Sequence, residues 1–171
     1  MEIYHGSTVI VEKPEIRTTK LHKDLSMNSD NNLFYTCSLI EYIGRITKNK
    51  RGELVGLLGD DIKRIYSHAD VFHCEPIEKV ADDFIERNNI EQGQYDNVGI
   101  ARYEVPGYWD VGKVFERLIE DVSDDQDRVD GIRKVYSSWL ADRILNFNSD
   151  LYYQPRAYLA ECYRAGKVID V

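Results

Sequence analysis

The residues of this chain that could hold a metal ion lie in one short stretch of its first half. His68, His73 and Cys74 carry imidazole and thiol groups, which are common ligands of zinc. The two histidines are five positions apart, whereas a helix places two side chains on one face when they are three or four apart. The spacing therefore predicts no metal site in this stretch.

A second candidate for metal binding is acidic. Asp125, Asp127 and Asp130 resemble part of a calcium-binding loop, but the third acid is displaced by one position. Ser137 stands where such a loop requires a bidentate glutamate. Acids placed here also stabilise the positive end of a following helix, so helix capping explains them without a metal ion.

Nucleophilic side chains are present without the partners that would activate them. Ser137 and Ser138 lie in a helical stripe with no histidine nearby in sequence and no GxSxG motif. The chain also lacks the glycine-rich motifs that bind phosphate groups. Cys37, Cys74 and Cys162 are odd in number and widely spaced, which predicts reduced, partly buried thiols.

Composition is typical of a folded, water-soluble protein. Of the 171 residues, 43% are hydrophobic and 30% are charged. No run approaches the roughly 20 apolar residues that cross a bilayer, and the N-terminus does not resemble a signal peptide. We therefore expect a cytoplasmic protein without a membrane partner.

The net charge of −8 opposes nucleic-acid binding, since a phosphate backbone requires clustered cations. It also argues against a helix-turn-helix at Glu53–Tyr66. A single basic cluster lies between two expected helices and comprises Arg45, Lys48, Lys50 and Arg51. We expect a solvated turn there, with contact to an acidic partner as the alternative.

The hydrophobic periodicity predicts a mainly α fold, a multi-helix bundle-like domain with a short N-terminal β segment. We expect β structure before about residue 16 and also around 98–105. Short helical segments are expected near 53–58 and 60–66, and longer helices over 32–48, 76–88, 111–122, 124–146 and 155–165.

Composition changes divide the chain into three expected parts: a β segment at 1–24, a helical subdomain at 28–92 and a second one at 108–171. In the second subdomain, Trp139 lies at the centre of an apolar stripe. We therefore expect its indole to be buried against the preceding helix, on the face that contains Phe115, Leu118 and Ile119.

Two segments resemble known families. Ile3-Tyr4-His5-Gly6-Ser7 has the Tyr-His-Gly-Ser motif, and residues 1–24 resemble the start of a bacterial ADP-ribosyltransferase-like family. That family continues with Asp-Phe-Gly and Gly-Phe-Tyr motifs, whereas here Leu25-Ser26-Met27 follow Asp24. Residues about 28–90 resemble a small helical bacterial family of unknown function. The first segment is therefore interpreted as a fused remnant.

The first resemblance implies a role for His5, because the histidine of the family's first strand hydrogen-bonds the NAD ribose. His5 is thus a candidate cofactor-binding residue. The family also uses a tyrosine that stacks on nicotinamide and a further residue, often glutamate, that acts on the ribose. No residue can be assigned to these two roles, so we expect a vestigial His5 and no bound cofactor.

Tyrosines are concentrated near the C-terminus and could form a half-exposed face for a protein partner. The alternative is that they simply pack at the edge of the hydrophobic core. The candidates for partner binding are Tyr152, Tyr153, Tyr158 and Tyr163. We predict a non-catalytic helical interaction module that regulates an ADP-ribosyltransferase-like partner. A degenerate NAD-dependent transferase remains the alternative, and a homo-oligomer stays open.

Overall fold

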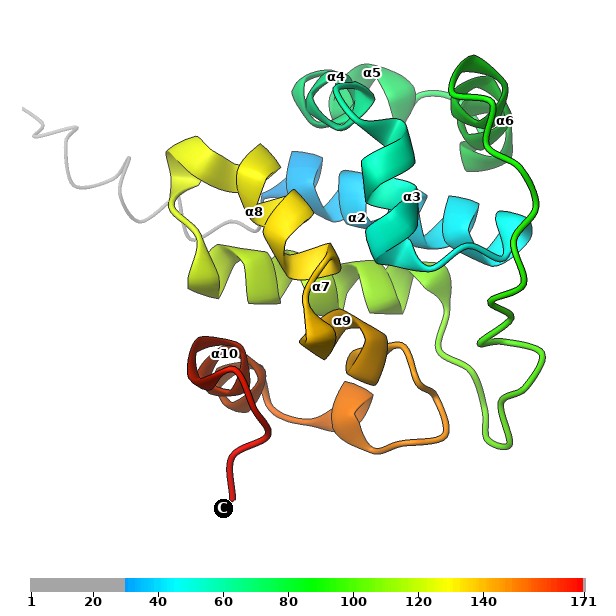
Figure 1. Cartoon of the computed structure of the whole chain (residues 1–171). Helices are drawn as coiled ribbons and strands as arrows, with labels where there is room; N and C mark the ends of the chain where they lie inside the picture. Colours follow the sequence, from blue (N-terminus) through cyan, green and yellow to red (C-terminus); the bar gives the residue numbers. More distant parts are fainter. Residues whose placement is uncertain (1–29, 171) are drawn as a thin grey trace, which may run out of the picture.

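The fold was analysed in a computed structural model that describes residues 30–170 (Figure 1). The expected β segment and His5 lie outside the described residues. The helices are α2 (Asn31–Thr47), α3 (Arg51–Leu58), α4 (Asp61–Ser67), α5 (Ala69–Phe72), α6 (Ile77–Arg87), α7 (Tyr108–Val122), α8 (Arg128–Tyr136), α9 (Trp139–Ile144) and α10 (Arg156–Ala165), with short 3-10 turns η2 (Asp125–Asp127) and η3 (Leu151–Tyr153). The prediction of a mainly α fold is confirmed.

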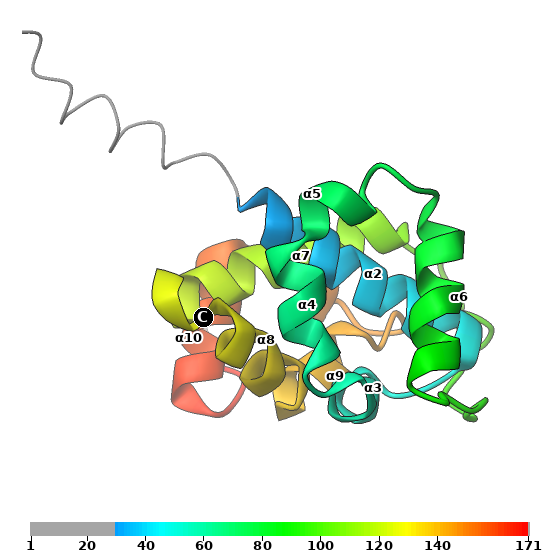
Figure 2. The ribbon, with the colours of Figure 1, turned by 90° about the horizontal axis from the view of Figure 1, so that it is seen from above.

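Helix α2 is the centre of the molecule, with α7 on one side and α4, α5 and α6 on the other (Figures 1 and 2). Its residues 35–41 are buried without interruption, so this helix has no solvent face along that stretch. Asp30 before α2 contacts Glu120 near the end of α7, while Arg45 reaches Pro106 before α7 begins. The two helices are therefore antiparallel.

A glycine allows α2 and α7 to pack closely. A Cβ atom on Gly112 would overlap both the hydroxyl and the backbone of Ser38, so a larger residue would push the helices apart. The apolar core that results is continuous and contains residues of both expected subdomains.

The basic cluster between α2 and α3 is only partly solvated. Lys48 and Lys50 are exposed, as expected of a solvated turn, but the prediction is wrong for Arg51. Its side chain is only 1% exposed and forms a two-point ion pair with the buried Glu41, with both N–O distances 2.9 Å. Arg45 Nε donates to the same carboxylate at 2.9 Å. Gly44 leaves the space that Arg51 fills, because a Cβ there would overlap the guanidinium. Arg51 therefore belongs to the core.

The segment expected as one helix over 124–146 is divided at Ser137 and Ser138. Ser138 has extended backbone angles, and its hydroxyl donates to Val135 O at 2.6 Å. This break rotates α9 relative to α8, and Trp139 becomes 37% exposed instead of buried. Tyr136 packs on Phe115 in its place, with the ring centres 4.3 Å apart. The prediction for Trp139 is therefore wrong.

The 88–107 loop has no strand, which corrects the expectation of β structure at 98–105. Its first part instead binds the last carbonyl groups of α2, where Gly93 N and Tyr95 N donate to Thr47 O and Lys48 O at 2.8 and 2.7 Å. These bonds satisfy acceptors that a helix end leaves open. The loop is thus held by the end of the central helix.

Substituting Arg51→Met should destabilise the fold by about 3–5 kcal/mol, because Glu41 keeps its buried charge and loses its main partner. The measurement is the free energy of unfolding in urea. Arg87→Met is the matched control, since it breaks an exposed ion pair with Asp61 and should cost about 1 kcal/mol or less. Equal losses in the two variants would contradict the role assigned to the buried pair.

Truncating Tyr136→Ala should cost about 3–5 kcal/mol, because its fully buried ring stacks on Phe115. Trp139→Ala should cost only about 1–2 kcal/mol, because part of the indole is already in water. Thermal unfolding followed by circular dichroism ranks the two variants. A larger loss for Trp139→Ala would show that the helix break at Ser137 and Ser138 is not present.

Candidate functional site

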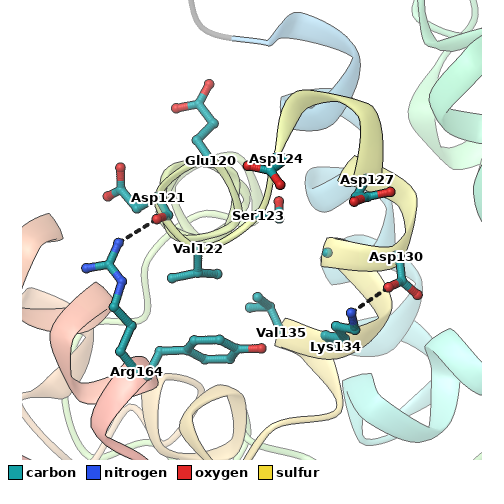
Figure 3. A pocket seen from close by; sticks show the side chains of 12 residues that line it. Glu120, Asp121, Val122, Ser123, Asp124, Asp127, Asp130, Lys134, Val135 and Arg164 are labelled. Carbon is teal, nitrogen blue, oxygen red and sulfur yellow. Dashed lines mark hydrogen bonds and ion pairs between the residues drawn. The ribbon is translucent and has the colours of Figure 1, made fainter.

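A hollow of about 440 Å³ opens between the end of α7, the start of α8 and α10 (Figure 3). It is rich in carboxylates and contains a smaller apolar part made of valine and tyrosine. The lining residues are Glu120, Asp121, Val122, Ser123, Asp124, Asp127, Asp130, Gly131, Lys134, Val135, Tyr163 and Arg164. Other concave surfaces within residues 30–170 also bear charged side chains, such as a more open one of about 500 Å³ that includes Asp60, Asp61 and Arg87.

Three of the acids have cationic partners. Arg156 forms ion pairs with Glu120 at 3.1 Å and Asp121 at 2.6 Å. Lys134 lies 2.7 Å from Asp130, and this hydrogen-bonded contact raises the pKa of Lys134 and lowers that of Asp130. Both members of the Lys134–Asp130 pair therefore keep their charges near neutral pH.

The remaining two acids, Asp124 and Asp127, receive no side-chain hydrogen bond or ion pair from any residue within 30–170. Both are exposed on the rim of the hollow. Figure 3 shows their carboxylates on the short connection between α7 and α8. Asp127 contributes to the raised pKa of Lys134. Neither carboxylate accepts a side-chain hydrogen bond within residues 30–170, so both can accept one from a cation outside the molecule.

A buried arginine holds this connection in place. Arg128 Nη1 donates to the backbone carbonyls of Ile119 and Ser123, at 3.2 and 2.6 Å, and so caps the end of α7. Its other terminal nitrogen pairs with Asp125 at 2.5 Å. Asp125 therefore supports the arginine that caps the end of α7. Neither Asp124 nor Asp127 forms a side-chain cap hydrogen bond at the start of η2 or α8, so the expected capping of the following helix is not observed. The rim acids thus stand on a fixed turn.

The four tyrosines predicted to bind a partner do not all lie in the hollow. Tyr163 lines it, whereas the hydroxyl of Tyr158 donates to Ile169 O at 2.8 Å. Tyr152 packs edge-on against Phe147, and its neighbour Tyr153 is exposed. Of this set, Tyr163 is the residue that could contact a ligand of the hollow.

The residues considered for metal binding or nucleophilic chemistry have local partners. His73 packs beside Tyr35, with ring centres 5.3 Å apart, and His68 Nδ1 lies 3.1 Å from Arg64 O. Cys74 is exposed and its thiol contacts Asp70 O, while the other two cysteines are buried. Within residues 30–170 no three possible ligands converge on one point.

Sequence reasoning missed a buried carboxylate on α7. Glu116 is fully buried, and neither of its carboxylate oxygens accepts a well-oriented hydrogen bond from another residue in the range 30–170. Lys113 Nζ lies 2.6 Å from Oε2, yet burial still raises the pKa of Glu116 above its ordinary value. Glu116 lies outside the lining of the hollow, so its charge has no direct part in this candidate site.

A second surface was also missed, because its residues were assigned to a strand. The tip of the 88–107 loop exposes Val98, Ile100 and Tyr103 to solvent. Asp96 and Gly99 could have indicated a turn here, since the Asp96 carboxylate accepts Gly99 N at 2.7 Å. This tip is therefore a local, defined structure.

Comparisons with protein-family models, curated proteins and solved structures found no match to this chain. No helix within residues 30–170 has the length and apolar character needed to cross a membrane.

Proposed function

We propose that this protein is a non-catalytic helical module that binds another protein, and that the hollow between α7, α8 and α10 receives a basic side chain of that partner. The observation that carries the proposal is the position of Asp124 and Asp127 on the rim of a cavity that also contains Tyr163. Neither carboxylate forms a hydrogen bond or a close ion pair with another side chain of the described part of the chain. A concave site with a few convergent polar groups is a typical binding site.

The shape of the site favours arginine or lysine over a small inorganic cation. The aliphatic part of such a side chain would pack on Val122, Val135 and the ring of Tyr163, which share the lining with the acids. Its charged end would then reach Asp124 and Asp127 and form charge-assisted hydrogen bonds. The net charge of −8 would increase the rate of encounter with a basic partner.

The partner class that we propose is an ADP-ribosyltransferase-like protein, which this module would regulate by binding. This part of the proposal depends on the resemblance of residues 1–24 to the start of that family. The alternative, a degenerate NAD-dependent transferase, depends on His5 alone. A catalytic site needs a set of cooperating groups, and only this one can be assigned from the resemblance.

The variant Asp124→Asn/Asp127→Asn should bind a fluorescein-labelled arginine-rich peptide roughly twofold to thirtyfold more weakly, because each exposed charge pair contributes about 0.2–1 kcal/mol. Fluorescence anisotropy at constant ionic strength measures the change. Asp82→Asn/Asp83→Asn is the matched control, because it removes the same charge from the exposed face of α6. Equal weakening in the control would assign the binding to overall charge and refute the role of the hollow.

Calorimetric titration of the wild-type chain with NAD should show no saturable binding, because His5 lacks the nicotinamide platform of the family it resembles. The variant His5→Ala should give the same trace. If the wild type bound NAD saturably and His5→Ala did not, the result would refute the interaction module and support the transferase alternative.

A further inference from the structure

We infer that the tip of the 88–107 loop is a self-association surface, which pairs two copies of this chain about a twofold axis. The tip comprises residues 96–104 and is separate from the hollow. The loop enters α7 at Tyr108, whereas the hollow is lined by the last residues of that helix, up to Val122 at its other end. A helix of 15 residues is about 22 Å long, so both surfaces can be occupied at once.

The tip is rigid before any partner binds. Asn97 is buried and its side-chain amide donates to Leu145 O at 3.0 Å. Asn148, in the same segment as Leu145, also binds the tip, donating to Ile100 O at 3.1 Å and accepting from Arg102 N at 2.8 Å. A Lys48–Asp96 ion pair of 3.1 Å joins it to the end of α2. An interface built on such a loop does not have to order it first.

This rigid tip presents apolar side chains to water. Ile100 and Tyr103 are 67% and 68% exposed, and Val98 is partly exposed beside them. The hydrogen bonds at Asn97 and Asn148 hold the backbone in a conformation that keeps these side chains outside the core. Loops of this length without secondary structure are uncommon in small domains and usually functional, and exposed apolar side chains on them favour contact with a protein.

The charges of the tip favour a second copy as the occupant. Arg102 and Glu104 are exposed, and neither side chain has an ion pair or hydrogen bond to any residue of the described part of the chain. In a twofold interface, a residue that meets a second residue is met by it in return. Arg102 of each copy can therefore pair with Glu104 of the other, which gives two equivalent ion pairs around the apolar centre.

The overall charge is compatible with this arrangement. The chain carries −8, which opposes contact between copies through most of its surface. At the tip, the opposite charges of Arg102 and Glu104 sum to zero. Two copies can therefore approach each other at this face without net repulsion between these charges. A strongly basic partner would find no excess of negative charge here, in contrast to the hollow.

Sedimentation velocity of the full chain tests the inference. Over roughly a hundredfold range of concentration, the wild type should shift from the mass of one chain to that of two. Ile100→Glu should stay monomeric where the wild type is a dimer, because it places a charge in the apolar centre of the interface. Val71→Glu is the matched control on α5, where the valine is 60% exposed, and it should associate as the wild type does.

A charge exchange tests the pairing itself. Arg102→Glu and Glu104→Arg should each weaken association at least tenfold or so, because each places like charges opposite one another. The double exchange should restore it to within roughly threefold of the wild type. A wild type that stays monomeric, equal loss in Val71→Glu, or failure of the double exchange would each overturn the inference. None of these results bears on peptide binding by the hollow.

Discussion

The buried ion pair between Glu41 and Arg51 is the interaction on which the remaining architecture depends. Two charges removed from water cost several kcal/mol each, and this cost is offset only when nearly every donor and acceptor finds a partner. Two of the partners are local, namely Arg45 on α2 and the carbonyl of Asn49. The third is distant in sequence: the side-chain oxygen of Asn97 lies 3.3 Å from Arg51 Nη2. The pair therefore joins α2, α3 and the 88–107 loop.

Placement of the loop also determines the surface that we assign to self-association. Asn97 accepts from Arg51 and donates to Leu145 O, so the same side chain links the buried pair to the end of α9. Asn148, three residues further along, then holds the loop tip. The exposed apolar tip of the loop is thus held in place through contacts that lead back to the buried Glu41–Arg51 pair. The hollow depends in a similar way on Arg128, which is itself largely buried.

The two proposed surfaces differ in charge and polarity and therefore suit different partners. The hollow at the end of α7 offers carboxylates and suits a basic partner. The loop tip is apolar at its centre, and its charges are balanced once Asp96 is paired with Lys48. Their separation by the length of α7 means that a dimer would present two hollows to its surroundings. Two linked sites raise the apparent affinity for a partner that can reach both.

By itself, the sequence determined the helices whose apolar stripes repeat at helical spacing. The expected helices over 32–48, 76–88 and 155–165 are observed as Asn31–Thr47, Ile77–Arg87 and Arg156–Ala165, because periodicity, prolines and Gly166 are local signals. Only the tertiary structure decided that Arg51 is buried, that Trp139 faces water and that residues 98–105 form a loop. Those outcomes depend on Glu41, on the break at Ser138 and on Asn148. Burial of a charge depends on how the helices and loops pack around it, and the local sequence pattern does not record which side chains that packing brings to Arg51.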